Sequence, residues 1–212
     1  MKQVYCYDLD GVCYLQIPKC ANTSILIMMY GDLIDDMDGF KKISSKRQHA
    51  FFKQRRKMYL KKEFEKSFKF TFVRNPYDRI FSAWFDKIYT GNGAFYGTFA
   101  AYGVKKDESF KGFVEKISRF EDEKLNDHIR SQYFVAKHVI ETGGFVGKVE
   151  NIGEQVRVVE AKLNRKFPVY KFNNKKNIDK YKKIKLSSLN EYSKAIIYKR
   201  YRDDFDNFEY KR

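Results

Sequence analysis

The feature that most constrains this chain is a pattern of strand, loop and helix that occurs twice. Residues 12–17 are β-prone and precede a proline, and residues 24–33 are apolar on almost every side, which is typical of a helix buried against a sheet. The second copy has a short strand at 69–73, a turn, and one apolar helical face at 80–88. Strands that alternate with helices predict an α/β fold with a central, mainly parallel sheet flanked by helices on both faces.

The remaining patterns add elements to this sheet and its helices. Residues 4–7 are β-prone, and the Asp10-Gly11 dipeptide favours a tight hairpin turn before the next strand. Ser188 and Glu191 form a capping box that predicts the start of the last helix. Apolar spacing predicts four further elements, namely a helix with Phe51, Phe52, Met58 and Leu60 on its buried side, a helix at 110–117, a strand at 144–149 and a helix at 156–163.

Length and composition indicate one globular domain over residues 1–212. With 43% apolar and 17% aromatic residues, the chain can bury a full hydrophobic core. The longest apolar run near the start, 25–30, is far shorter than the ~20 residues that a bilayer span needs, and no signal peptide precedes it. We therefore expect a cytoplasmic protein. The odd set of Cys6, Cys13 and Cys20 matches no zinc spacing, so we expect neither a disulfide nor a metal.

The charge indicates an anionic partner. Lys and Arg number 43 against 27 Asp and Glu, which gives a formal net charge of +16. Such a surface attracts polyanions or highly phosphorylated small molecules. Runs of lysine such as 180–185 are also typical of a solvated face, so the charge alone leaves a nucleic-acid-binding protein open.

The first loop combines a turn, small side chains and hydroxyls between a strand and a helix. Backbone N–H groups at the start of a helix can surround a phosphate or sulfate. The loop differs from the loop that binds nucleoside triphosphates, because its lysine comes first and it has no glycine. A simpler interpretation is that its polar residues only cap the helix. The residues of this candidate anion site are Pro18, Lys19, Cys20, Ala21, Asn22, Thr23 and Ser24.

The second loop offers an arginine and a hydroxyl. Arg74 stands at the carboxyl end of a predicted strand, and Ser82 follows on the next helix. A guanidinium fork with a hydroxyl suits one phosphate monoester, although Arg74 and Arg79 could instead form surface salt bridges. Open α/β sheets bind their ligands at adjacent strand ends, so we expect the two loops to serve one ligand.

The two loops together resemble a known family. PKCANTS at 18–24 and VRNPYDRIFSAW at 73–84 are similar to the 5′-phosphosulfate loop and the 3′-phosphate motif of sulfotransferases that use 3′-phosphoadenosine 5′-phosphosulfate (PAPS). DHIRSQ at 127–132 and FVGKVEN at 145–151 resemble the carbohydrate (family 2) sulfotransferases. Departures are Ala21, where many relatives have Gly, and Ser131, where Pro is frequent.

The resemblance implies a nucleotide-kinase-like sulfotransferase fold and a role for each loop residue. Lys19 would stabilise the charge on the leaving group, and the loop from Pro18 to Ser24 would bind the 5′-phosphosulfate. Arg74 and Ser82 would hold the 3′-phosphate. Adenosine 3′,5′-bisphosphate would be the product, and the scheme requires no metal. Positioning and charge stabilisation are also what in-line transfer of such a group needs.

A base must take the proton of the acceptor hydroxyl, and histidine is best matched to this near neutral pH. His49 lies in a region that resembles the place of the catalytic histidine in uronyl 2-O-sulfotransferases, and His128 lies in a motif that resembles the family's. We predict His49 as the base and His128 as a substrate-binding or second base residue, an order that could be reversed. The acceptor would be a carbohydrate, and an anionic one would suit a basic groove that includes Arg47, Arg55 and Arg130.

Two other functions fit parts of the sequence. A nucleotide-dependent small-molecule kinase would share the fold but would need ATP and Mg, and the missing Gly-Lys-Ser/Thr opposes it. A basic nucleic-acid-binding protein would bind DNA or RNA with steep salt dependence and would ignore PAPS. We favour the sulfotransferase and expect no nucleic-acid partner. Because eukaryotic carbohydrate sulfotransferases usually carry a membrane anchor, its absence here suggests a bacterial or viral protein, or a chain that has been trimmed.

Overall fold

A computed structural model describes residues 3–43, 45–91, 96–167 and 178–212. By their contacts the described residues divide into two compact units. Unit 1 contains those of Met1–Val73 and Ala136–Phe172, and unit 2 contains those of Arg74–Val135 and Asn173–Arg212. The chain passes from the first unit to the second directly after a strand, between Val73 and Arg74.

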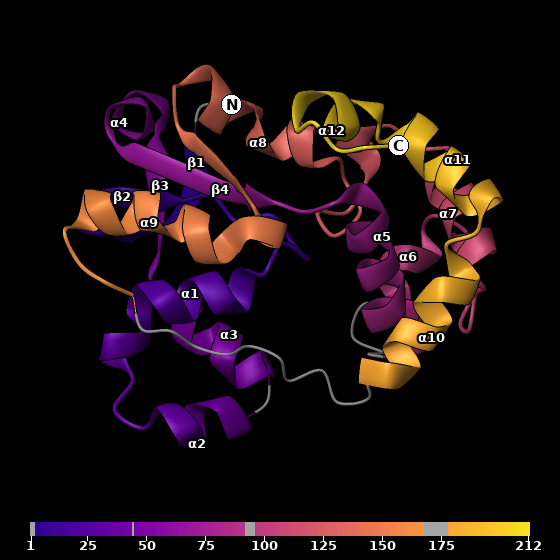
Figure 1. Ribbon diagram of the computed structural model, residues 1–212, viewed down its shortest axis with the longest axis horizontal. Helices are drawn as coiled ribbons and strands as arrows, with labels where there is room; N and C mark the ends of the chain where they lie inside the picture. The colour runs from indigo at the N-terminus through magenta and orange to yellow at the C-terminus, as the bar shows by residue number, and fades with distance from the viewer. Residues whose placement is uncertain (1–2, 44, 92–95, 168–177) are drawn as a thin grey trace. The chain divides into compact units, whose positions relative to one another are not determined.

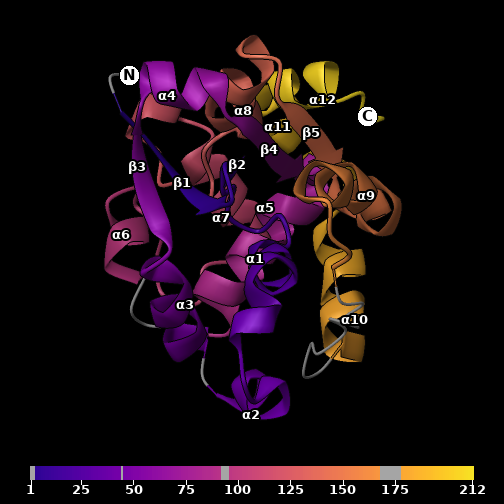
Figure 2. The same ribbon diagram turned by 90° about the vertical axis from the view of Figure 1, so that its left-hand side faces the viewer.

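Unit 1 is built on a five-stranded mixed sheet with the strand order β3-β1-β2-β4-β5. Figure 2 shows β3 at one edge of this sheet and β5 at the other. The pairs β1–β2 and β1–β3 are antiparallel, and the pairs β2–β4 and β4–β5 are parallel. The expected α/β class is confirmed, but the sheet is mixed instead of mainly parallel. The strands are β1 (Gln3–Leu9), β2 (Val12–Tyr14), β3 (Arg56–Leu60), β4 (Phe68–Val73) and β5 (Phe145–Lys148).

Helices cover both faces of this sheet. One face carries Tyr14, Phe70 and Phe72, which pack with apolar residues of α1 and α9. The other face carries Val4, Cys6 and Cys13, which pack against α4 and α8. In Figure 1 the helices α4 and α1 accordingly lie on opposite sides of the strands. The helices of this unit are α1 (Asn22–Tyr30), η1 (Gly31–Leu33), α2 (Met37–Lys42), α3 (Ser45–Lys53), α4 (Lys61–Lys66), η5 (Val149–Asn151) and α9 (Ile152–Leu163), with α8 (Gln132–Glu141) shared between the units.

The opening hairpin forms as predicted, whereas the element after α3 does not. Asp10 and Gly11 both take positive φ, 49° and 80°, as a tight turn between β1 and β2 requires. The predicted helix through Phe51 to Leu60 ends at Lys53, and residues 56–60 form the edge strand β3. Only the first part of the predicted apolar face is therefore buried, because alternate residues of an edge strand face outward, and Leu60 is 53% exposed.

Unit 2 consists of helices around an aromatic core. Phe81, Phe113 and Phe205 are buried at its centre. The last predicted cap is wrong by two residues, because α10 continues to Ser188 and the side chain of Asn190 accepts the N–H of Ser193 to cap α11. The helices of unit 2 are α5 (Pro76–Trp84), η2 (Phe85–Tyr89), α6 (Tyr96–Ala100), α7 (Phe110–Ile117), η4 (Asp122–Lys124), α10 (Ile178–Ser188), α11 (Glu191–Arg200) and α12 (Arg202–Asn207).

Candidate functional site

The first predicted loop, which we call the donor loop (residues 18–24), connects β2 to α1 in unit 1. The donor loop follows the carboxyl end of β2, and β2 is the parallel neighbour of β4. Lys19 and Ala21 both have positive φ, 71° and 57°. Alternation of left-handed and right-handed backbone is the geometry that turns successive N–H groups toward one anion.

The start of α1 is suited to an anion. Its N-cap is Ala21, which has no side-chain acceptor, and the first turn contains no acidic residue. The helix dipole and the N–H groups of the first turn therefore present partial positive charge beside Thr23 and Ser24. The interpretation of this loop as an ordinary side-chain cap is weakened, since no side-chain cap hydrogen bond is made at the N-cap.

A buried tyrosine fixes the amide of Asn22. The Tyr14 hydroxyl donates to Asn22 Oδ1 at 2.6 Å. Burial raises the pKa of Tyr14 well above its usual value, so the hydroxyl remains a donor across the working pH range. Because Oδ1 is the acceptor, the amide nitrogen of Asn22 forms the other branch of the side chain and carries two N–H donors.

The second predicted loop leads to a group of polar side chains in unit 2, which we call the arginine site: Arg74, Asp78, Ser82, Tyr181 and Lys185. Arg74 Nη2 lies 4.0 Å from Asp78 Oδ2, and Lys185 Nζ lies 2.5 Å from Asp78 Oδ1. The ring of Tyr181 packs against Phe81 and Phe85, with centroids 5.0 and 4.9 Å away.

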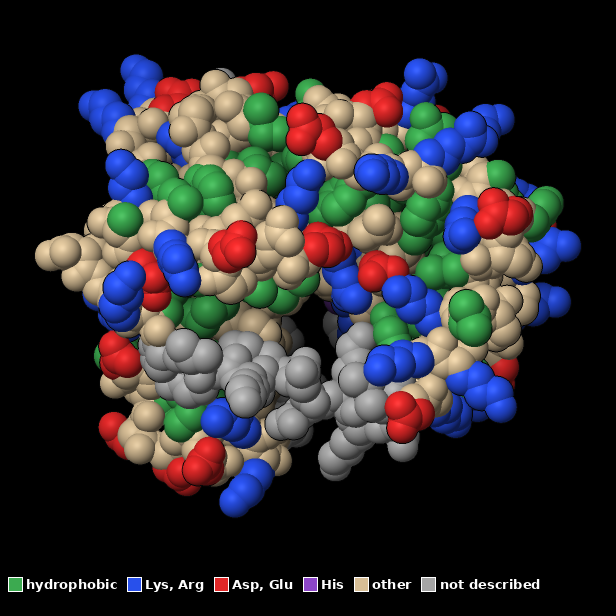
Figure 3. All heavy atoms as spheres, in the orientation of Figure 1, with side chains coloured by type: hydrophobic (Ala, Val, Ile, Leu, Met, Phe, Trp, Pro, Cys, Tyr) green, Lys and Arg blue, Asp and Glu red, His purple; other side chains and the backbone are tan. Residues whose placement is uncertain are grey.

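The arginine site carries net positive charge with hydroxyls beside it. Burial raises the pKa of Tyr181, while the neighbouring guanidinium of Arg74 and the hydroxyl of Ser82 act in the opposite direction. Two cations and one carboxylate leave a formal charge of +1 next to two hydroxyl donors. Such a set suits a dianionic phosphate. Tyr181 and Lys185 were not predicted; the lysine lies in a run that the sequence presents as a solvated face, and Figure 3 shows many Lys and Arg side chains on such faces.

The segment around His128 is held rigidly within unit 2. Arg79 is completely buried and donates to the carbonyls of Arg130 and Asp127, at 2.8 and 3.0 Å. Tyr201 donates to the carbonyl of Ile129 at 2.6 Å. Arg79 is therefore a buried structural anchor, and the hypothesis of a surface salt bridge is wrong for this residue.

The side chain of Asn126 sets the orientation of the His128 imidazole. Asn126 Oδ1 accepts the backbone N–H of His128 at 3.0 Å and lies 2.8 Å from its Nδ1. Since Oδ1 already accepts one N–H and has no proton of its own, Nδ1 must be the donor. In the neutral ring Nε2 then carries the lone pair, which is the state that a general base requires.

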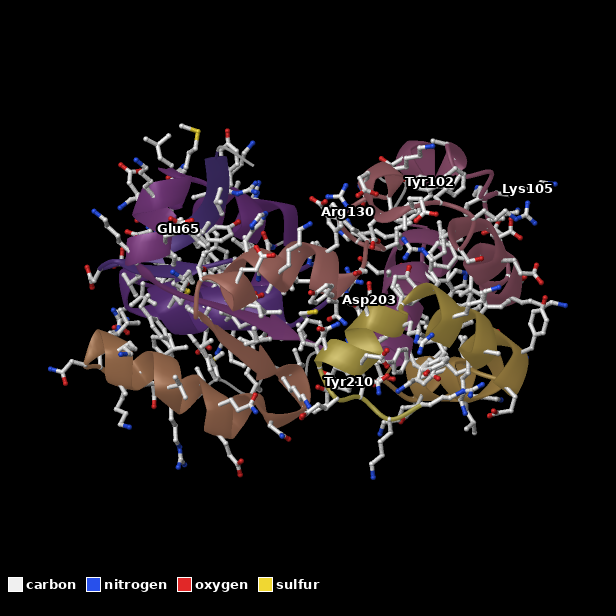
Figure 4. All side chains as sticks on the ribbon, turned by 90° about the horizontal axis from the view of Figure 1, so that it is seen from above. Glu65, Tyr102, Lys105, Arg130, Asp203 and Tyr210 are labelled. Atoms are coloured by element: carbon white, nitrogen blue, oxygen red, sulfur yellow. The ribbon has the colours of Figure 1, made fainter. Side chains whose placement is uncertain are left out.

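The other predicted residues have different surroundings. Arg47 is exposed on α3, and Arg55 donates to the carbonyl of Phe51 at 2.7 Å. Arg130, labelled in Figure 4, donates to Asp127 Oδ1 and to the carbonyls of Asp122 and Leu125. These contacts hold its own loop, and a role in an acceptor groove stays a prediction. His49 belongs to α3, but its side chain lies outside the described part of the chain.

Comparison with known proteins assigns the family. A family model described as "Sulfotransferase family" matches residues 3–211. This chain belongs to that sulfotransferase family. The mixed sheet with flanking helices is consistent with the sulfotransferase fold, and the match includes both the donor loop and the arginine site.

Two curated relatives of this sulfotransferase have the same name. Carbohydrate sulfotransferase 12 of Xenopus laevis is 24% identical over 198 residues, which cover 74% of this chain and 47% of the relative. Carbohydrate sulfotransferase 12 of Mus musculus is 26% identical over 187 residues, covering 69% of this chain and 45% of the relative. The chain thus spans about half the length of these relatives. No solved structure matches the chain.

None of the described helices of this sulfotransferase is both long and apolar enough to cross a membrane. Across residues 3–43, 45–91, 96–167 and 178–212, no group of three His, Cys, Asp or Glu side chains could hold a metal ion.

Proposed function

We propose that this sulfotransferase moves a sulfuryl group from PAPS to a hydroxyl of a carbohydrate. The observation that carries the proposal is the donor loop, where two residues of positive φ lead into a helix whose N-cap lacks a side-chain acceptor. This loop follows β2, the parallel neighbour of the strand that leads to Arg74. Family membership supports the reaction, and the name of the two relatives supports the class of acceptor.

The donor loop supplies what a 5′-phosphosulfate needs. Backbone N–H groups of the first turn of α1 and the hydroxyls of Thr23 and Ser24 would bind its anionic oxygens. The amide N–H groups of Asn22 would add a further donor, held in place by Tyr14. Lys19 would stabilise the negative charge that develops on the leaving oxygen.

The arginine site supplies what a 3′-phosphate needs. Arg74 and Ser82 would contact its oxygens, as the family resemblance implies, and Tyr181 would add a hydroxyl from α10. Lys185 would contribute a second positive charge, since it shares the carboxylate of Asp78 with Arg74. This arrangement favours a nucleotide that carries a phosphate at the 3′ position.

The transfer step is an in-line displacement at sulfur. The acceptor oxygen forms a bond to sulfur while the bond from sulfur to the bridging phosphate oxygen breaks, and the electron pair of that bond stays on the phosphate. The proton of the acceptor hydroxyl goes to the histidine base. The hydrogen bond between Asn126 and His128 supports a base role for His128, while His49, the base that the sequence favours, stays a prediction.

The experiment is a transfer assay with PAPS that carries radioactive sulfur. The acceptors are an uncharged glycan, a carboxylated glycan, a sulfated glycan and a small phenol. We expect label on a glycan, more on the anionic ones because the chain has a formal charge of +16, and label that appears about 10²- to 10³-fold more slowly with Lys19→Ala. Label on the phenol alone would contradict the carbohydrate acceptor, and no dependence on PAPS would contradict sulfuryl transfer itself.

The kinase and the nucleic-acid binder are less well supported. Family membership favours sulfuryl transfer over phosphoryl transfer from ATP. The arginine site also differs from a nucleic-acid surface, since Tyr181 is buried with its ring packed on Phe81 and is not exposed for base stacking.

A further inference from the structure

The backbone of Arg74 is held by a side chain from a distant part of unit 2. Gln132 Oε1 accepts the N–H of Arg74 at 2.8 Å, and Gln132 Nε2 donates to the carbonyl of Arg74 at 2.8 Å. Arg74 lies immediately beyond β4, where the strand pairing has ended. The amide of Gln132 therefore makes the two backbone hydrogen bonds that a neighbouring strand would make at this residue. It thereby fixes the backbone from which the Arg74 side chain extends.

Gln132 is itself held by a buried carboxylate. Asp204 Oδ2 accepts the side-chain Nε2 of Gln132 at 3.2 Å and its backbone N–H at 3.0 Å. Asp204 Oδ1 accepts the N–H of Tyr133 at 2.7 Å. Asp204 thus caps the start of α8 and fixes the amide that contacts Arg74. Gln132 and Asp204 are both fully buried.

The cost of burying Asp204 indicates that the contact is specific. Burial raises the pKa of this carboxyl, and the N–H donors of Gln132 and Tyr133 together with the nearby Arg79 act in the opposite direction. A buried carboxylate is tolerated only where hydrogen bonds compensate for the lost water. Here three N–H groups do so, and one of them belongs to the amide that holds Arg74.

We propose that Gln132, supported by Asp204, is a positioning residue that makes the arginine site selective for a 3′-phosphorylated nucleotide. The proposal rests on the proposed function. Ser82 lies on α5 and Tyr181 on α10, whereas the direction of the Arg74 guanidinium depends on the backbone that Gln132 holds. Loss of the amide should displace Arg74 and weaken contacts to the 3′-phosphate more than contacts to the rest of the nucleotide.

The test is calorimetric titration with adenosine 3′,5′-bisphosphate and with adenosine 5′-monophosphate, which lacks the 3′-phosphate. Gln132→Met keeps the length of the side chain and removes both hydrogen bonds. We expect the affinity for the bisphosphate relative to that for the monophosphate to fall about tenfold, since two hydrogen bonds near a charged group are lost. The affinity for the monophosphate should change less than about threefold. Asp204→Asn should lower the ratio less, because an amide can still accept N–H groups through one oxygen.

Asn190→Ala is the matched control. It removes the side-chain cap of α11 in the same unit, so it should lower the melting temperature and leave the ratio unchanged. If Gln132→Met binds both nucleotides as the wild type does, or weakens both equally, the residue is only structural and the proposal is overturned. If Gln132→Met does not fold, Gln132→Asn, which is one methylene too short to reach both groups, takes its place. If the wild-type protein does not bind the bisphosphate more tightly than the monophosphate, the proposed function itself is contradicted.

Discussion

The donor loop and the arginine site differ in where their shape comes from. The donor loop is formed by residues that are neighbours in the chain, and its geometry comes from two positive φ angles and the start of one helix. The arginine site depends on contacts between segments 58 residues apart, as for Gln132 and Arg74, and 72 residues apart, as for Asp204 and Gln132. The donor loop is therefore shaped mainly by local conformation, whereas the arginine site depends on segments that come together only when unit 2 folds.

The two regions are also expected to have different roles, a division of work in which one region affects the rate of transfer and the other affects donor affinity. The donor loop contains Lys19, the residue expected to act on the leaving group, so damage there should reduce the rate. The arginine site is proposed to contact a phosphate that takes no part in bond breaking, so damage there should reduce affinity. The following predictions test this division, beginning with the largest expected effect.

Removal of the base should have the largest effect on rate. We expect His128→Ala to lower turnover by about 10²- to 10⁴-fold and to leave the affinity for adenosine 3′,5′-bisphosphate unchanged. Asn126→Ala should lower turnover less, because the ring loses its orientation but keeps its nitrogen atoms. His138→Ala, in the third histidine, is the control and should keep full activity. The measurement is the initial rate of transfer at saturating donor.

The same assay decides between the two histidines. If His49→Ala loses turnover and His128→Ala keeps it, then His49 is the base and the orientation given by Asn126 has another purpose. This outcome would also assign the base to unit 1, which contains His49, and not to unit 2, which contains His128.

Lys19→Ala should have the next largest effect. Loss of a cation that stabilises developing charge typically lowers the rate by about 10²- to 10³-fold. The affinity for adenosine 3′,5′-bisphosphate should fall much less than with an arginine-site variant. Lys182→Ala, in an exposed lysine of α10, is the matched control. A Lys19→Ala variant with weakened binding and normal turnover would contradict the division of work.

Variants of the arginine site should act on affinity. Arg74→Ala removes hydrogen bonds to a charged group, and we expect affinity for the bisphosphate to fall by about tenfold to a hundredfold. Tyr181→Phe removes one hydroxyl and should cost about threefold to tenfold. Turnover at saturating donor should stay within about threefold of the wild-type value, which is small compared with the loss for Lys19→Ala. Equal losses of turnover and affinity would mean that the two regions cannot be separated.

The smallest effect concerns stability. Ala21 has φ of 57°, a conformation that glycine adopts without the Cβ penalty. We expect Ala21→Gly to raise the free energy of unfolding by about 0.5–1 kcal/mol, measured by thermal or denaturant melting. Asn164→Gly is the control at another positive φ, and it should gain less because Asn tolerates this region. A destabilised Ala21→Gly would show that the loop tolerates Ala21 without strain.

The sequence predicts the two regions unequally, for a physical reason. The donor loop, the opening hairpin and the helices with clear apolar spacing are visible because each is decided by neighbouring residues. Tyr181 and Asp204 carry no local signal, and the motif that contains Gln132 does not reveal its role, since these roles depend on partners far away in the chain. The edge strand β3 was predicted as helix because Met58 and Leu60 are apolar but exposed, which local spacing does not reveal.

The most direct test of the central claim is calorimetric titration of the wild-type protein and Arg74→Ala with adenosine 3′,5′-bisphosphate, with ATP and Mg²⁺ as the comparison. The account predicts saturable binding of the bisphosphate to the wild type, a clear loss in the variant, and weaker binding of ATP. Absence of binding, or a preference for ATP that Arg74→Ala leaves unchanged, would contradict the assignment of PAPS as donor.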